Sequence, residues 1–130
     1  MILGFKPQFP EPIKKGIKKH TIREDKHNRW KAGIIIHMAT GVRTKLYNCF
    51  KKTTCTGTQR IEISWITMYT VRNATIYVDD RVVGKYTNGY ASGLCKMIAK
   101  NDGFESVEDF FKWFSSDFKG KIIHWTDLRY

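Results

Sequence analysis

The sequence predicts a small α+β fold in which about six strands form a twisted sheet or small barrel and two or three helices pack against it. Up to residue 83, apolar residues alternate with polar ones or form short runs that end at glycine, which is typical of strands. From residue 91 to 118 the apolar residues follow helical spacing instead. A chain of 130 residues is long enough for a single domain, residues 1–130, whose core needs no disulfide or structural metal.

The first half of the chain predicts three strands and one short helix. Apolar runs favour strands at 1–5, 34–40 and 45–50, the second of which lies between two glycines. The proline-rich stretch 7–12 leads into a short predicted helix that Gly16 ends, because glycine commonly stands just past a helix.

The clearest alternation of apolar and polar residues predicts a strand at 60–68. Two further strands are expected at 75–78 and 81–83, with the turn of a hairpin at residues 79–80 between them. The segment 121–125 predicts a final strand at the end of the chain.

Apolar residues at positions i, i+3, i+4, i+7 and i+8 predict an amphipathic helix at 91–99 and a second helix after it. Thr87 or Asn88 is expected to cap the start of the first helix, and Gly103 is expected to follow its end. Ser106 is expected to cap the second helix, because its hydroxyl oxygen can accept a backbone N–H of the first turn. The apolar stripe of that helix is expected to face the core and comprises Val107, Phe110, Phe111, Phe114 and Phe118.

The formal net charge of +11 belongs entirely to the first half of the chain. Residues 1–60 hold 14 Lys or Arg and three acidic residues, whereas residues 61–130 hold nine of each sign. Two basic clusters, 14–31 and 43–52, carry most of this charge, and they predict a polyanionic partner, of which nucleic acid is the commonest inside cells. A solvated basic face and an acidic protein partner are the alternatives. Aromatic residues that bases can stack on lie among these charges: Phe9, Trp30, Tyr47 and Phe50.

Other classes of function are disfavoured. Three cysteines, Cys49, Cys55 and Cys95, are too few and too scattered for a disulfide scaffold, and they favour free thiols in a reducing cytoplasm. The chain has no apolar run of membrane-spanning length, no signal-peptide pattern and no basic amphipathic helix, so no membrane partner is expected. No metal-ligand spacing and no glycine-rich phosphate loop occurs, so no metal and no cofactor is expected.

The segment 16–25 holds the densest set of chemical groups in the chain. If it is extended, Thr21 and Arg23 point to the same side, and a hydroxyl beside a guanidinium suits an anion or a carbonyl group. Lys18 lies three residues before Thr21, so a bend between them would bring the two side chains together. Glu24 is expected to pair with surrounding cations, as is Asp25.

Four segments of the chain carry motifs of one known family. The first two are the pattern Gly-x-Lys-x-x-Thr-Ile-Arg at residues 16–23 and Arg-Trp-Lys-x-Gly at 29–33. The other two are the acidic turn Asn-Asp-Gly-Phe at 101–104, with a helix after it, and the final segment 120–125. Together they resemble the ASCH family, PUA-like β-barrels associated with RNA, and the resemblance covers most of the chain; the final segment is similar to the closing strand of phage and prophage members. The resemblance implies a barrel with a cleft that the first motif and the acidic turn both face.

The resemblance also implies an activity. Some relatives remove the acyl group from N4-acetylcytidine, with a threonine nucleophile, a lysine base and an assisting glutamate. Carried over, Thr21 is the nucleophile, Lys18 is the base, and the acid is Asp102, which is one methylene shorter than glutamate. A lysine acts as base only when its pKa falls toward neutrality, which nearby cations such as Lys19 and Arg23 favour. Other relatives are ribonucleases or RNA binders.

Three hypotheses of function follow. The preferred one is an ASCH-type module that binds RNA or a modified nucleoside in a basic cleft, and the second is an N4-acylcytidine amidohydrolase. The third is a protein-interaction module, for which the resemblance to phage members implies a phage origin. Trp30 is expected either to stack a base or to pack in the core, and His20 is expected to be a solvated loop histidine. The oligomeric state stays open. The candidate ligand-binding residues are Lys18, Lys19, Arg23, Arg29 and Trp30.

Overall fold

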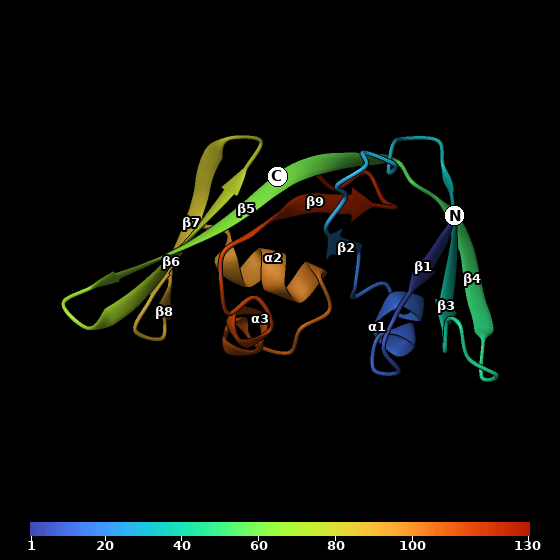
Figure 1. Ribbon diagram of the computed structural model, residues 1–130, viewed down its shortest axis with the longest axis horizontal. Coiled ribbons are helices and arrows are strands. Elements are labelled where there is room, and N and C mark those ends of the chain that lie inside the picture. The colour runs from blue at the N-terminus through green and yellow to red at the C-terminus, as the bar shows by residue number, and fades with distance from the viewer.

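The computed structural model describes residues 1–130 and contains nine strands and three helices in an α+β arrangement. The larger sheet is antiparallel throughout and curls into a half-barrel over two of the helices (Figure 1). The predicted fold class, α+β with a barrel-like sheet, is therefore confirmed. In spatial order the strands of this sheet are β2 (His20–Arg23), β9 (Phe118–His124), β5 (Gly57–Met68), β6 (Val71–Val78), β7 (Arg81–Thr87) and β8 (Tyr90–Ala91).

A second sheet of three strands stands at the other end of the molecule beside the first helix (Figure 1). Its strands are β1 (Ile2–Gly4), β3 (Ile35–Thr40) and β4 (Asn48–Thr54), and the helix is α1 (Pro10–Lys14). β1 runs parallel to β3, and β3 runs antiparallel to β4. The three strands expected in the first half of the chain thus form a sheet of their own, separate from the half-barrel.

The β6–β7 hairpin turns where the sequence predicts it. Asp79 and Asp80 both have positive φ, 49° and 65°, as the tight two-residue turns that match the twist of a hairpin require. The long strand β5 pairs with β6 on one side and β9 on the other, so the alternation predicted at 60–68 lies at the centre of the sheet.

The helix α2 (Cys95–Asn101) begins four residues later than the spacing at 91–99 predicts. The expected cap at Thr87 or Asn88 is wrong, because both residues belong to the β7–β8 hairpin. Asn88 and Gly89 have φ of 49° and 78°, the turn that an Asn-Gly pair favours between two strands. The expected end of the helix is correct, since Gly103 follows it with φ of 91°.

The helix α3 (Val107–Trp113) begins as predicted. The hydroxyl oxygen of Ser106 accepts the backbone N–H of Asp109 at 3.1 Å and so caps the helix. The predicted stripe is split, because the chain leaves the helix after Trp113 and Phe118 begins β9. Phe118 still packs against the same core as the helical phenylalanines.

The apolar interior has two parts, which lie under the two sheets. The larger packs α2 and α3 against the half-barrel, and the smaller packs α1 against the three-stranded sheet. Phe104, in the turn between α2 and α3, packs against both. None of the three helices has the length and apolar character needed to cross a membrane.

We predict that Ser106→Ala lowers the free energy of unfolding by about 1 kcal/mol, because the first turn of α3 loses its side-chain cap. Urea unfolding measures this. Ser116→Ala is the matched control, since Ser116 is exposed and its hydroxyl makes no hydrogen bond. Equal stability of the two variants would contradict the capping role.

Candidate functional site

Two segments that lie more than 80 residues apart in the sequence meet beside α2. The backbone N–H of Lys19 donates to the carbonyl of Asn101 at 2.7 Å, which joins the loop before β2 to the end of α2. Two backbone N–H groups of the same loop, those of Ile17 and Lys18, donate to the carbonyl of Pro12 in α1. The loop is therefore held from both sides, and its side chains have a defined direction.

Lys18 points inward from this loop and is only 2% exposed. Its Nζ donates to the backbone carbonyl of Asp102 at 2.5 Å and lies 3.3 Å from the carboxylate Oδ1 of the same residue. The same nitrogen lies 4.7 Å from the centre of the Phe9 ring. Gly103 makes room for the lysine stem, because a Cβ at that position would lie 2.9 Å from Cδ of Lys18.

Burial is the largest influence on the Lys18 amine and lowers its pKa, since the charged form loses its hydration. The nearby carboxylate of Asp102 opposes this effect, and the Arg23 guanidinium adds to it. Of the two cations expected to lower this pKa, only Arg23 lies close enough to act. Lys19 is exposed.

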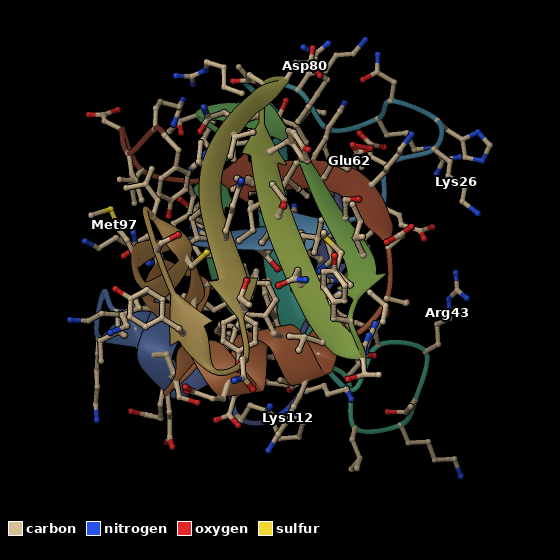
Figure 2. All side chains as sticks on the ribbon, turned by 90° about the vertical axis from the view of Figure 1, so that its left-hand side faces the viewer. Lys26, Arg43, Glu62, Asp80, Met97 and Lys112 are labelled. Atoms are coloured by element: carbon tan, nitrogen blue, oxygen red, sulfur yellow. The ribbon has the colours of Figure 1, made fainter.

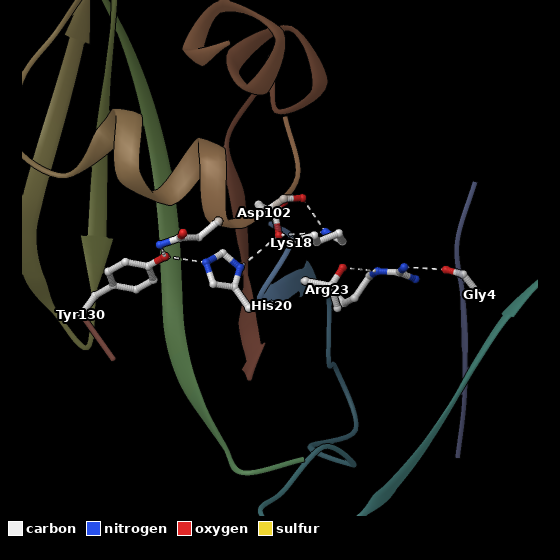
Figure 3. A network of polar contacts seen from close by, with 8 residues as sticks. Gly4, Lys18, His20, Arg23, Asp102 and Tyr130 are labelled. Atoms are coloured by element: carbon white, nitrogen blue, oxygen red, sulfur yellow. Dashed lines mark hydrogen bonds and ion pairs between the residues drawn. The ribbon is translucent and has the colours of Figure 1, made fainter. Parts of the chain in front are cut away.

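His20 is not the solvated loop histidine that the sequence predicts. It lies in β2 and is completely buried. Its Nδ1 is 3.1 Å from Oδ1 of Asp102, and its Nε2 is 2.5 Å from the hydroxyl of Tyr130 (Figure 3). Burial lowers the pKa of His20, so the ring is neutral at pH 7.

The direction of each hydrogen bond in this network follows from its chemistry. A carboxylate only accepts, so the proton of the neutral His20 ring sits on Nδ1 and is donated to Asp102. The unprotonated Nε2 then accepts from the Tyr130 hydroxyl, whose oxygen accepts from Nδ2 of Asn101 at 3.0 Å. Asp102 is thereby held through Oδ1 alone, and its Oδ2 has no hydrogen-bond partner within the chain.

Thr21 and Arg23 share one side of β2, as the extended spacing predicts. Nε of Arg23 donates to the Thr21 hydroxyl at 3.3 Å, and Nη2 of Arg23 donates to the carbonyl of Gly4 at 2.5 Å (Figure 3). The guanidinium also lies 5.1 Å from the centre of the Phe5 ring. The Thr21 oxygen accepts in this arrangement, so its own proton is available to a ligand.

These side chains line one cavity of about 410 Å³, a size common among small-molecule sites. Five of its lining residues carry polar or charged side chains: Lys6, Lys18, Thr21, Arg23 and Asp102. Five others are aromatic: Phe5, Phe9, Phe104, Trp113 and Phe114. Nζ of Lys6 lies 4.6 Å from the centre of the Trp113 ring. The cavity offers donors, acceptors and flat aromatic faces together.

Three of the expected ligand-binding residues do not line this cavity. Lys19 and Arg29 are exposed elsewhere on the surface. Trp30 is 7% exposed and packs in the smaller core. Of the two roles expected for Trp30, stacking a base or packing in the core, the structure therefore supports packing. The carboxylate of Asp25 accepts the backbone N–H groups of Arg29 and Trp30, and it pairs with Lys121 at 2.9 Å.

Of the aromatic wall, sequence reasoning singles out Phe9 alone; it misses the other four rings and the Tyr130 contact. Phe104 is the last residue of the acidic turn 101–104, and this short separation from Asp102 is the one signal that places a ring near that carboxylate. Nothing in the local pattern indicates that Tyr130, 110 residues from His20 along the chain, reaches that ring.

No protein-family model matches the chain, and neither a curated protein nor a solved structure matches it. No group of three or more His, Cys, Asp or Glu residues is placed to hold a metal ion. Function is therefore inferred from the residues of the cavity.

A second buried histidine lies behind the network. His124 packs edge-on against His20 at 5.4 Å between ring centres, and its Nε2 is 3.0 Å from Oε1 of Gln59. The other ring nitrogen, Nδ1, is buried without a partner. Burial, with help from the neighbouring His20, lowers the pKa of His124 to about 3.

We predict that this histidine makes the fold acid-sensitive. An unfolded histidine takes up a proton near pH 6.5, as its ordinary pKa of about 6.5 requires, whereas folded His124 stays neutral down to about pH 3. The unfolded state binds more protons in this window, so the free energy of unfolding falls as the pH drops below about 6.5. His124→Asn should reduce that fall, by at most about 1.4 kcal/mol per pH unit.

Urea unfolding between pH 7 and pH 5 measures the effect, and each variant is compared with its own value at pH 7. His27→Asn is the control, because His27 is exposed. An unchanged pH dependence in His124→Asn would show that His124 does not supply the acid sensitivity.

Proposed function

We propose that this protein binds a nucleoside, either free and modified or as one residue of an RNA chain, in the cavity beside α2. The observation that carries the proposal is the convergence of Lys18, Thr21, Arg23 and Asp102 on a cavity with aromatic walls. A planar base stacks on aromatic rings, while donors and acceptors fixed in the wall read its edges.

Each group of the cavity has a counterpart in a nucleoside. Oδ2 of Asp102 accepts from an exocyclic amine, and the Arg23 guanidinium donates to a ring carbonyl. The Thr21 hydroxyl can accept a hydrogen bond from an amine or donate one to a carbonyl. The positive charge of Lys6 at the same cavity suits a phosphate attached to the sugar. The resemblance of residues 16–23 and 101–104 to the ASCH family supports the same proposal.

We predict that Trp113→Ala weakens nucleoside binding by roughly tenfold to a hundredfold, because one stacked ring contributes about 1–3 kcal/mol. Isothermal titration calorimetry with cytidine, uridine, adenosine, guanosine and N4-acetylcytidine measures the affinities. Tyr90→Ala is the matched control, since Tyr90 is an exposed aromatic residue that does not line the cavity. Absence of binding for all five nucleosides would overturn the proposal for free nucleosides, and equal affinity of the two variants would place the ligand elsewhere.

A second candidate function is the hydrolysis of N4-acylcytidine, and one observation favours it. Lys18 is buried and lines the same cavity as Thr21, and burial lowers its pKa, as a general base requires. Oγ of Thr21 attacks the acyl carbon and Lys18 accepts the hydroxyl proton. The Arg23 guanidinium stabilises the oxyanion, and the proton passes to N4 as cytidine leaves. Water then attacks the acyl-threonine ester, releasing the carboxylic acid and restoring the hydroxyl.

We predict that, if the protein is this hydrolase, it converts N4-acetylcytidine to cytidine, as chromatography detects. Thr21→Ala should abolish turnover and Thr21→Ser should retain part of it. Thr67→Ala, at an exposed position of β5, should leave the rate unchanged. The rate should rise with pH through the lowered pKa of Lys18, because only the neutral amine accepts a proton. No turnover at high protein concentration would exclude the hydrolase and leave the binding function.

A further inference from the structure

A long basic segment lies outside the cavity and has no role in the function proposed so far. No acidic residue occurs between Asp25 and Glu62, whereas eight Lys or Arg residues do. Two of the eight, Lys26 and Arg60, form exposed ion pairs with acidic residues. The other six have no acidic partner.

Four of these six residues lie on the β3–β4 hairpin, which spans residues 35–54 and includes the loop between its two strands. Arg43 and Lys45 belong to the loop, and Lys51 and Lys52 belong to β4. All four are exposed, and Figure 2 shows Arg43 extending from its loop away from the body of the molecule. Uncompensated positive charge held at a surface in this way attracts a polyanion.

The hairpin lies directly beside the cavity. Val42, which precedes Arg43 in the loop, lines the cavity, and so does Gly4 of the adjacent strand β1. The side chain of Val42 is in close proximity to Gly4, since a Cβ there would lie 3.1 Å from Cγ2 of Val42. A polyanionic ligand that extends out of the cavity past Val42 therefore reaches Arg43 first.

We propose that the β3–β4 hairpin binds the phosphates of a single-stranded nucleic acid while one base of that strand occupies the cavity. The inference rests on the proposed function and assigns the surface that holds the phosphates when the bound nucleoside is one residue of a strand. A single nucleoside does not need four exposed cations outside the cavity, whereas a strand presents one phosphate for each of its residues. Tyr47, an exposed aromatic residue between Lys45 and Lys51, offers a further surface on which a base can stack.

The test measures fluorescence anisotropy of a labelled single-stranded RNA of about 12 nucleotides, a length within the usual range of such sites, and of a DNA of the same sequence, at several salt concentrations. One variant replaces four residues of the hairpin by alanine: Arg43, Lys45, Lys51 and Lys52. The control variant removes the same charge from four exposed lysines without ion pairs in the electrically balanced half of the chain: Lys85, Lys96, Lys100 and Lys112.

We expect the hairpin variant to bind the strand about tenfold or more weakly at low salt than the control variant does. The slope of log affinity against log salt should fall in magnitude by up to roughly 3, since each lost phosphate contact removes about 0.7 for a single strand. Nucleoside affinity should persist in the hairpin variant, because none of its four residues lines the cavity. A preference for the RNA over the DNA would identify the 2′-hydroxyl as part of the ligand.

Three outcomes separate this inference from the proposed function. Equal loss of strand affinity in the two variants overturns the inference, and the proposed function stands if nucleosides still bind. Strand binding that depends on the hairpin, with no nucleoside binding and no loss of strand affinity in Trp113→Ala, supports the phosphate surface and overturns the proposed function. Binding of poly-L-glutamate in place of either nucleic acid overturns the inference in favour of an acidic protein partner.

Discussion

The contact between Lys18 and Asp102 is the constraint on which the rest of the site depends. Placing both groups out of water is costly, and such a pair persists only where further hydrogen bonds satisfy it. The structure supplies them: the amine also donates to the backbone carbonyl of Asp102, and the carboxylate also accepts from His20. Because these partners occupy only one carboxylate oxygen, the second oxygen is left for a ligand.

The cavity owes its aromatic walls to the seam between the two apolar cores. Phe104 belongs to the turn that joins α2 to α3 and packs against both cores, while Phe5 and Phe9 come from the smaller core. A seam between packed units leaves concave space that neither unit fills by itself. The polar groups reach the seam from β2 and from the end of α2, so both the flat faces and the polar groups of the site result from how the two sheets are placed.

Local features of the sequence predict the local structure well and the long-range network poorly. Ser106 caps its helix and Thr21 shares a side of β2 with Arg23, because both features depend on neighbouring residues only. The predicted start of α2 is wrong because two local signals compete there, and the Asn-Gly turn of the β7–β8 hairpin prevails over the helical spacing. The prediction for His20 is wrong because its partners lie more than 80 residues away, so no local pattern shows that it is buried.

Of the two functions considered for the cavity, only hydrolysis depends on the protonation state of Lys18, because activating Thr21 requires the neutral amine. Two opposing influences act on the pKa of Lys18: burial and the Arg23 guanidinium lower it, whereas the Asp102 carboxylate raises it. A ligand N–H that donates to Oδ2 of Asp102 partly offsets the charge of the carboxylate, while Lys18 keeps its contact with Oδ1. It thereby weakens the one influence that favours the charged form of Lys18. Under the proposed functions, ligand binding at Asp102 would therefore be coupled to proton acceptance by Lys18.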